Sequence, residues 1–314
     1  MHDRPRAALL LSGHLRQACN SQNVSRARTQ LFQHVASCRA TFRCDVFLHT
    51  WTTVDAATAK WSTGQLSRQA SESSYQCLDE ITGEIAPTAT AVEVQDLKAL
   101  SSQVLRRGLY FKPALVATRM NLHGMAATVQ MMNAHAATMN LSYAIAVRMR
   151  VDMGARFSID HHLSWINITQ GWALVRARAN ALSPQSPRTL HGCRRFSPGV
   201  KNGDNCFWGV AAVLSDVVLR AKARLNSYIP STATIASAHH ARGSNQSWPL
   251  LNVSSCRERL LRWFPEAVLL CAMNESGVVG CAAHCSSCHH ETVPCPRRSP
   301  YCVAGGACRD GCCA

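Results

Sequence analysis

The sequence predicts an α/β fold with a mostly parallel sheet flanked by helices, and three observations support this prediction. Residues Ala7–Ser12 form a short apolar run that ends at Gly13, as expected of a buried parallel strand followed by a tight turn. A second strand is expected over Cys44–His49, after a polar, helix-compatible stretch over 18–38. Strand, helix and strand in this order make a βαβ unit, whose strands lie parallel in one sheet.

The middle of the chain adds two helices and a strand to this prediction. Residues 52–92 are rich in threonine, serine and alanine and are expected to be mostly loop, with no secondary structure assigned to Tyr75–Ile81. Val94–Arg107 and Leu122–Met139 place apolar residues at helical spacing. Tyr143–Met149 alternates with a period of two, so Ile145, Val147 and Met149 face one way and the arginines the other.

The last third of the α/β region is less regular. We expect Trp172–Val175 to be a short strand and residues 206–225 to be a helix that begins near Gly209. Cys256–Trp263 is expected to be another helix, and Ala267–Leu270 a final strand.

Composition divides the 314 residues into two units. An apolar content of 47% excludes a mainly disordered chain, and the apolar runs are shorter than the roughly 20 residues of a membrane span. Nine of the 16 cysteines fall within the last 44 residues. The sequence therefore predicts an α/β domain over 1–270 and a small cysteine-rich appendage over 271–314.

The formal charge of +15 belongs to the first unit, because the charges of the last 44 residues sum to zero. A basic surface favours anionic partners such as nucleotides and phosphates. No block of five or six consecutive basic residues occurs. We expect no nucleic-acid partner. A zinc-binding module that recognises DNA would itself be basic, whereas the cysteine-rich last 44 residues are neutral.

The cysteines of the appendage leave several chemistries open. Disulfides are one, and zinc bound through Cys281, Cys285, Cys288 and His289 or His290 is another. Cys285–His289 matches the haem-attachment pattern C-x-x-C-H formally, but no haem is expected, since such a match arises easily among nine cysteines.

The sequence contains six N-glycosylation acceptors, whereas chance alone predicts about two in a chain of this composition, and this excess points to the secretory pathway. They are Asn23, Asn140, Asn167, Asn245, Asn252 and Asn274. Glycosylation and disulfides both belong to an oxidising lumen. The first residues do not resemble a signal peptide. The sequence therefore indicates either a cytoplasmic protein or a gene model that lacks an N-terminal membrane anchor, and we favour the second.

The strongest candidate site is Arg148-Met-Arg150-Val-Asp152. A strand places these three charged side chains on one face at its carboxyl end, where ligands bind in α/β sheets. Two guanidinium groups suit a diphosphate, and a carboxylate suits a divalent metal or a ribose. The alternative is a structural Arg–Asp salt bridge.

Two further segments are candidates. In Ser12–Arg16, Gly13 allows the backbone to approach a nucleotide and Arg16 is placed to meet a phosphate, or the segment is an ordinary turn. In Asn202–Gly209, Asp204 either begins a helix or acts as a catalytic base or acceptor-binding group.

The ordered motifs resemble a poorly characterised group of nucleotide-sugar glycosyltransferases of algae, other eukaryotes and large viruses. The matching segments are Ser12–Arg16, Asp45–Trp51, Tyr143–Asp152 and Gly203–Gly209. The resemblance implies a GT-A-like, Rossmann-type fold that transfers a sugar from a nucleoside-diphosphate donor to a hydroxyl of a glycan, protein or lipid in the Golgi lumen.

The resemblance also assigns roles to residues. Asp152 stands where such enzymes place the metal- and nucleotide-binding aspartate, with Mn²⁺ or Mg²⁺ as the metal. Arg150 stands where the first acid of D-x-D is usual, so this guanidinium is expected to neutralise the diphosphate itself. His49 and Trp51 are expected to line the donor or acceptor pocket, with Trp51 stacking on a base or sugar.

Two other functions remain open at this point. One is a basic, zinc-stabilised protein that binds nucleic acid, and the other is a catalytically inactive α/β scaffold. Asp160, His161 and His162 are further possible metal ligands, or simply surface loop residues.

Overall fold

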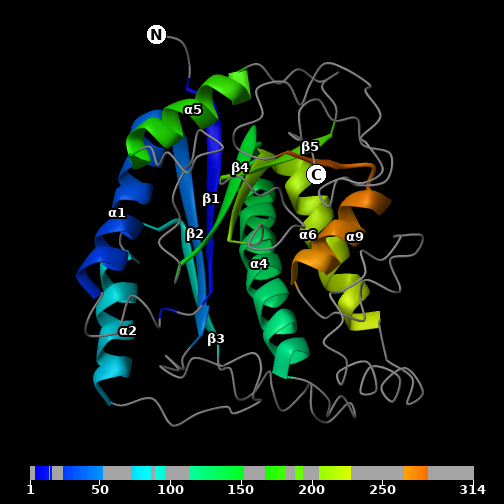
Figure 1. Cartoon of the computed structure of the whole chain (residues 1–314). Helices are drawn as coiled ribbons and strands as arrows, with labels where there is room; N and C mark the ends of the chain where they lie inside the picture. The colour runs from blue at the N-terminus through cyan, green and yellow to red at the C-terminus, as the bar shows by residue number, and fades with distance from the viewer. Residues whose placement is uncertain are drawn as a thin grey trace, which may run out of the picture.

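The computed structural model describes residues 4–13, 15, 24–51, 72–85, 89–95, 113–151, 167–180, 188–193, 205–227 and 265–281. They form one seven-stranded sheet with helices on both faces (Figure 1). The strands are β1 (Arg6–Ser12), β2 (Arg43–Trp51), β3 (Ala91–Gln95), β4 (Ile145–Arg150), β5 (Thr189–Gly192), β6 (Cys206–Val210) and β7 (Val279–Cys281). The helices are α1 (Val24–Thr41), α2 (Glu72–Ile85), α4 (Pro113–Thr138), α5 (Ile168–Asn180), α6 (Ala211–Ser227) and α9 (Pro265–Glu275).

The sheet is mostly parallel, as the βαβ pattern predicts. Its strand order is β3-β2-β1-β4-β6-β5-β7. β1 pairs in parallel with β2 and β4, and β2 pairs in parallel with β3. Among the described strands, only β6 runs against its neighbours, β4 and β5, while β7 is parallel to β5.

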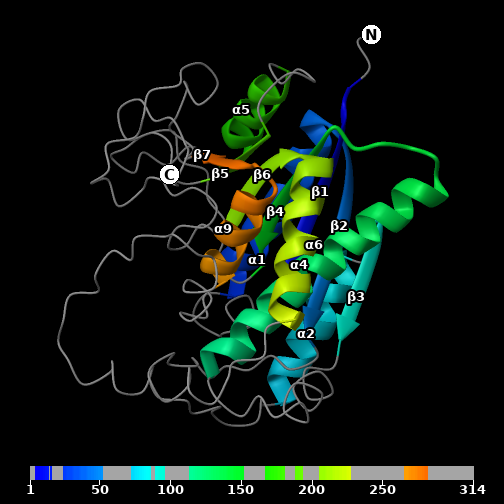
Figure 2. The ribbon, with the colours of Figure 1, turned by 90° about the vertical axis from the view of Figure 1, so that its right-hand side faces the viewer.

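Two apolar layers cover the two faces of the sheet. Even-numbered side chains of β1, with Phe47 of β2, pack under α4, α6 and α9. Odd-numbered side chains of β1 pack under α1, α2 and α5. Figure 2 shows α4, α6 and α9 together on one face. This alternation places Arg148 on the α4 face and Val147 in the opposite layer, as the sequence predicts.

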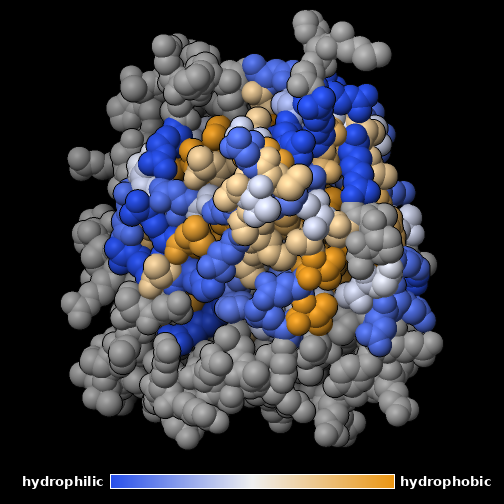
Figure 3. Space-filling model, turned by 180° about the vertical axis from the view of Figure 1, so that it is seen from behind, coloured by the Kyte–Doolittle hydropathy of each residue, from blue (hydrophilic) through white to orange (hydrophobic). Residues whose placement is uncertain are grey.

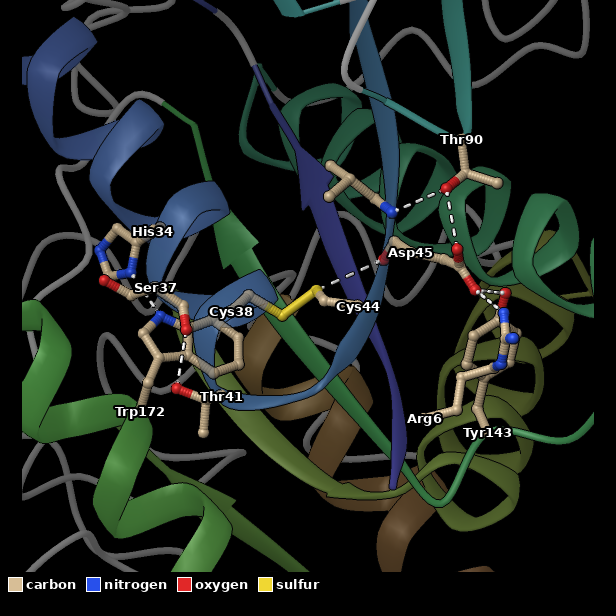
Figure 4. Close-up of a disulfide and its surroundings, with 11 residues drawn as sticks. Arg6, His34, Ser37, Cys38, Thr41, Cys44, Asp45, Thr90, Tyr143 and Trp172 are labelled. Carbon is tan, nitrogen blue, oxygen red and sulfur yellow. Dashed lines mark hydrogen bonds and ion pairs between the residues drawn. A yellow bond between two sulfur atoms is a disulfide. The ribbon is translucent and has the colours of Figure 1, made fainter. Parts of the chain in front are cut away.

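Two disulfides join consecutive elements in the described part of the chain. Cys38 near the end of α1 is bonded to Cys44 at the start of β2 (Figure 4). Cys193 directly after β5 is bonded to Cys206, the first residue of β6. Disulfides are consistent with a secreted or lumenal protein.

Several expected elements differ from the structure, and the first is Glu72–Ile85, which forms α2 in a stretch expected to be mostly loop. Trp172–Val175 lies in α5 and not in a strand. Gly171, Trp172 and Val175 form the buried face of this helix. The apolar residues of so short a buried face do not distinguish a helix from a strand. Ala267–Leu270 lies in α9 for the same reason. Residues 206–210 form β6, and the expected helix begins after Gly209, at Ala211.

The expected helix over Val94–Arg107 is wrong at its start, because Val94 and Gln95 end β3. This strand is short and its side chains are only partly buried, so its apolar pattern is weak. Residues 96–107 lie outside the described part, as does the helix expected over Cys256–Trp263. The expected helix over Leu122–Met139 is confirmed, apart from its last residue, as the larger part of α4.

The α/β fold continues past residue 270. Ala272 and Met273 of α9 are buried in the core, and β7 pairs with β5 at the edge of the sheet. The expected boundary at 271 therefore falls inside α9. Residues 282–314, which hold most of the expected appendage, lie outside the described part.

None of the described helices combines the length and the apolar content that a membrane span requires. Figure 3 shows the side opposite to Figure 1, where apolar side chains gather in the middle of the described surface between polar ones. Of the large apolar side chains that the structure describes, Val94 and Met139 are the exposed ones. Isolated exposed apolar residues of this kind are ordinary on protein surfaces.

Candidate functional site

The strand order creates a switch point between β1 and β4. The chain runs outward from β1 to β2 and β3, then returns to β4 on the other side of β1. In open α/β sheets, ligands bind beyond the carboxyl ends of the strands at such a point. Ser12 of β1 pairs with His49 of β2 on one side and with Arg150 of β4 on the other. The predicted motifs therefore meet at one edge of the sheet, which we call the carboxyl edge.

Gly13 turns the chain at the end of β1. Its φ of 136° lies in the region that favours glycine. Its amide donates to the His49 carbonyl over 3.3 Å, and its carbonyl accepts from Thr50 Oγ1 over 3.0 Å. The turn is thus fixed to the end of β2. A side chain at Gly13 would strain this backbone, which explains the glycine of the predicted motif.

Arg148 is fully buried between the sheet and α4. Its Nη2 donates to Asn121 Oδ1 of α4 over 2.9 Å and to Ser12 Oγ over 3.3 Å. Its guanidinium also lies 6.0 Å from the centre of the Phe207 ring. An arginine with 0% exposure is placed to fix Ser12 and α4 rather than to meet a ligand directly.

Arg150 lies further out on the same face and is only partly buried. Its backbone amide donates to the Asn205 carbonyl over 2.8 Å, and its Nη1 donates to Asn205 Oδ1 over 3.2 Å. Asn205 is 2% exposed, and its Nδ2 forms no hydrogen bond in the described part of the structure. A buried amide donor costs about 1–3 kcal/mol when unsatisfied, so it favours an acceptor at this position.

The end of β2 is buried under α4. His49 and Trp51 have 0% and 1% exposure, and their rings meet edge to face at 4.8 Å. Gly124 of α4 allows this contact, because a Cβ there would lie 3.0 Å from His49 Nδ1. The expected stacking of Trp51 on a ligand stays a prediction, since its ring packs here on His49 and His123.

His123 on α4 is linked to β3 through a chain of hydrogen bonds. His123 Nε2 lies 2.6 Å from Gln95 Oε1, and the Gln95 amide donates in turn to the Glu93 carboxylate. The His123 ring lies 5.7 Å from the rings of both His49 and Trp51. This cluster of His49, Trp51, Glu93, Gln95 and His123 is called the histidine cluster below.

Burial keeps both histidines of this cluster neutral. Desolvation lowers the pKa of His123 to about 4, with help from Lys222 and His49 and against the effect of Glu93. Desolvation also lowers the pKa of His49, which Gln95 and Glu93 partly oppose. Neither His49 ring nitrogen makes a hydrogen bond of ordinary geometry to the described residues. Burial lowers the pKa of Lys222 as well.

Asp45 lies at the opposite edge of the sheet and has a structural role (Figure 4). Its carboxylate accepts from Arg6 Nη1 over 2.8 Å, from the Tyr143 hydroxyl over 2.9 Å and from Thr90 Oγ1 over 3.4 Å. Burial and this carboxylate raise the pKa of Tyr143. The network ties the amino ends of β1, β2 and β4 together.

Several predicted site residues lie outside the described part of the chain: Arg16, Asp152, Asp160, His161, His162 and Asp204. Their roles stay predictions. Ser12, Gly13, His49, Trp51, Arg148 and Arg150 are brought together at the carboxyl edge. The described residues hold no group of three or more histidine, cysteine or acidic side chains suited to a metal ion.

Sequence reasoning missed four polar residues of this edge: Gln95, Asn121, His123 and Asn205. Asn121 and His123 are two of several polar residues in α4, so neither is marked out by the sequence of the helix alone. Comparison with models of known protein families finds no match, and comparison with curated proteins finds no relative.

Proposed function

We propose that this protein is a glycosyltransferase that uses a nucleoside-diphosphate sugar and an acceptor hydroxyl. The observation that carries the proposal is the Arg150–Asn205 pair at the switch point between β1 and β4. Arg150, which is only partly buried, and the buried amide donor of Asn205 offer hydrogen bonds to an anion beside the Gly13 turn. The same R-x-R motif carries the resemblance to nucleotide-sugar glycosyltransferases with a GT-A-like fold.

In this proposal Arg150 binds the diphosphate and neutralises the charge that develops on it as the sugar leaves. Arg148 does not contact the donor in this proposal but holds Ser12 and Asn121 in place through hydrogen bonds. The described residues at this edge hold no group of three or more histidine, cysteine or acidic side chains that could bind a metal ion. The expected ligand, Asp152, lies outside the described residues, and the role assigned to Arg150 needs no metal.

Replacing Arg150 with alanine is expected to weaken nucleoside-diphosphate binding by about 100-fold, or about 2.8 kcal/mol, because a charge-assisted hydrogen bond is lost. The measurement is isothermal calorimetry with a panel of nucleoside diphosphates and their sugar conjugates.

The matched control for this variant is Arg4→Ala. Arg4 is exposed, precedes β1 at the opposite edge and donates to the Ala40 carbonyl, so its loss removes one positive charge without touching the site. Equal weakening in both variants would show only a general charge effect. If the wild-type protein binds none of the panel, the proposed function is wrong.

We further propose that the protein works in the Golgi lumen and carries N-glycans. Two disulfides support an oxidising compartment. The three acceptor asparagines in the described part, Asn140, Asn167 and Asn274, are exposed. We expect the protein isolated from its own cells to gain electrophoretic mobility after enzymatic removal of N-glycans. An unchanged mobility, with six acceptors in the chain, would contradict this placement.

A further inference from the structure

The hydrogen bonds of the histidine cluster fix the tautomer of His123. A carboxylate only accepts hydrogen bonds, so the Gln95 group that contacts Glu93 must be its amide NH₂. The carbonyl oxygen of Gln95 therefore faces His123 Nε2, 2.6 Å away. A carbonyl oxygen cannot donate, so Nε2 must carry the proton. The lone pair of the neutral ring is then on Nδ1.

Only one ring nitrogen of His123 is hydrogen-bonded to the described residues. His123 is only partly buried, and the hydrogen bond of its ring runs from Nε2 to Gln95. His49 differs in this respect, because it is fully buried under α4. His123 is thus the less buried histidine of this cluster, and its ring is held by Gln95 with the Nδ1 lone pair unused by the described residues.

The position of His123 suits a reaction at the carboxyl edge. His49, Ser12 and Arg150 lie on three neighbouring strands, in register. Adjacent strands are about 4.8 Å apart, so the Arg150 backbone is about 10 Å from that of His49. The His123 ring is 5.7 Å from the His49 ring. His123 therefore lies near the same edge of the sheet as Arg150.

We propose that His123 is the general base of the transfer reaction, an inference that rests on the proposed function. Nδ1 takes the proton of the acceptor hydroxyl while its oxygen forms a bond to the anomeric carbon. The bond from that carbon to the diphosphate oxygen breaks, and its electron pair leaves with the diphosphate beside Arg150. The imidazolium then returns its proton to solvent. Gln95 and Glu93 are positioning residues that keep Nε2 protonated.

The charged and titratable groups around His123 support a neutral base. They are His49 on β2, Glu93 on β3 and Lys222 on α6. Burial and Lys222 lower the pKa of His123 and Glu93 raises it, with the result near 4. A base must be unprotonated, so turnover should fall as pH falls through about 4 and should be constant above it.

The test compares His123→Gln with His135→Gln. Glutamine at 123 keeps an amide donor near the Nε2 position but has no Nδ1 lone pair. We expect its turnover to fall by about 100-fold or more while its donor affinity stays within about twofold of wild type. His135 lies near the other end of α4, bonded to Tyr143, so turnover of His135→Gln should equal that of wild type.

The outcomes separate this inference from the proposed function. The wild type is tested for donor turnover with water or an added hydroxyl compound as acceptor. If the wild type is active and His123→Gln turns the donor over at the same rate, His123 is not the base. The glycosyltransferase proposal survives that result. If no donor binds, or none that binds is turned over, both proposals fail. Nitrogen-15 NMR of the imidazole rings is independent of activity: a His123 proton on Nδ1 would overturn the inference, and one on Nε2 supports it.

Discussion

Replacement of both Cys193 and Cys206 by alanine is expected to lower the free energy of unfolding by about 3 kcal/mol. The disulfide closes a loop with a sequence separation of 13. A cross-link of this size removes about 3 kcal/mol of conformational entropy from the unfolded chain. The measurement is urea unfolding of the two proteins without reductant.

The change should also weaken donor binding. Cys206 directly follows Asn205, which holds Arg150 through both its backbone and its side chain. The matched variant replaces Cys38 and Cys44, whose sequence separation is 6, and should cost about 2 kcal/mol without affecting the donor. Detection of four free thiols at these positions in the native, oxidised protein would contradict the pairing.

The second large effect is expected from Gly209→Ala. Gly209 lies in β6 between Ala146 of β4 and Leu190 of β5. A Cβ there would lie 2.8 Å from the Thr189 carbonyl oxygen and 2.7 Å from Leu190 Cδ2. The carbonyl is backbone and can move only if β5 moves. We expect a loss of about 2–3 kcal/mol in the free energy of unfolding.

Gly83→Ala is the matched control, because the same substitution on α2 meets no atom within 4 Å. It should leave stability unchanged or raise it by up to about 1 kcal/mol, since alanine favours a helix. Equal stability of the two variants in urea unfolding would show that β5 and β6 are not packed as described.

The central parallel strands β1, β2 and β4 could be predicted from the sequence because they are largely buried on both faces, whereas the partly buried β3 could not. Ala7–Ser12 and Cys44–His49 are apolar runs without helical period, and each ends in a turn or polar residue. The antiparallel half could not be predicted in this way. β5 and β7 have four and three residues, too few to show a period.

The candidate site could be predicted where it follows the strands of the parallel half. Arg148 and Arg150 alternate with the apolar residues of β4, and the alternation places them on one face. Which of the two is buried could not be predicted, because that depends on Asn121 and Phe207, which are far away in the sequence. The Glu93–Gln95–His123 chain likewise joins a strand and a helix whose contact has no local signal.

The central claim is that an anionic ligand binds at the carboxyl edge between β1 and β4. Chemical-shift mapping of the isotopically labelled protein with nucleoside diphosphates tests it directly. We expect the largest shifts at the amides of Gly13, Arg150 and Asn205, including the Asn205 side-chain amide, and none at Asp45 or Tyr143. Shifts confined to the Asp45 edge, or none at any nucleotide concentration, would contradict the account.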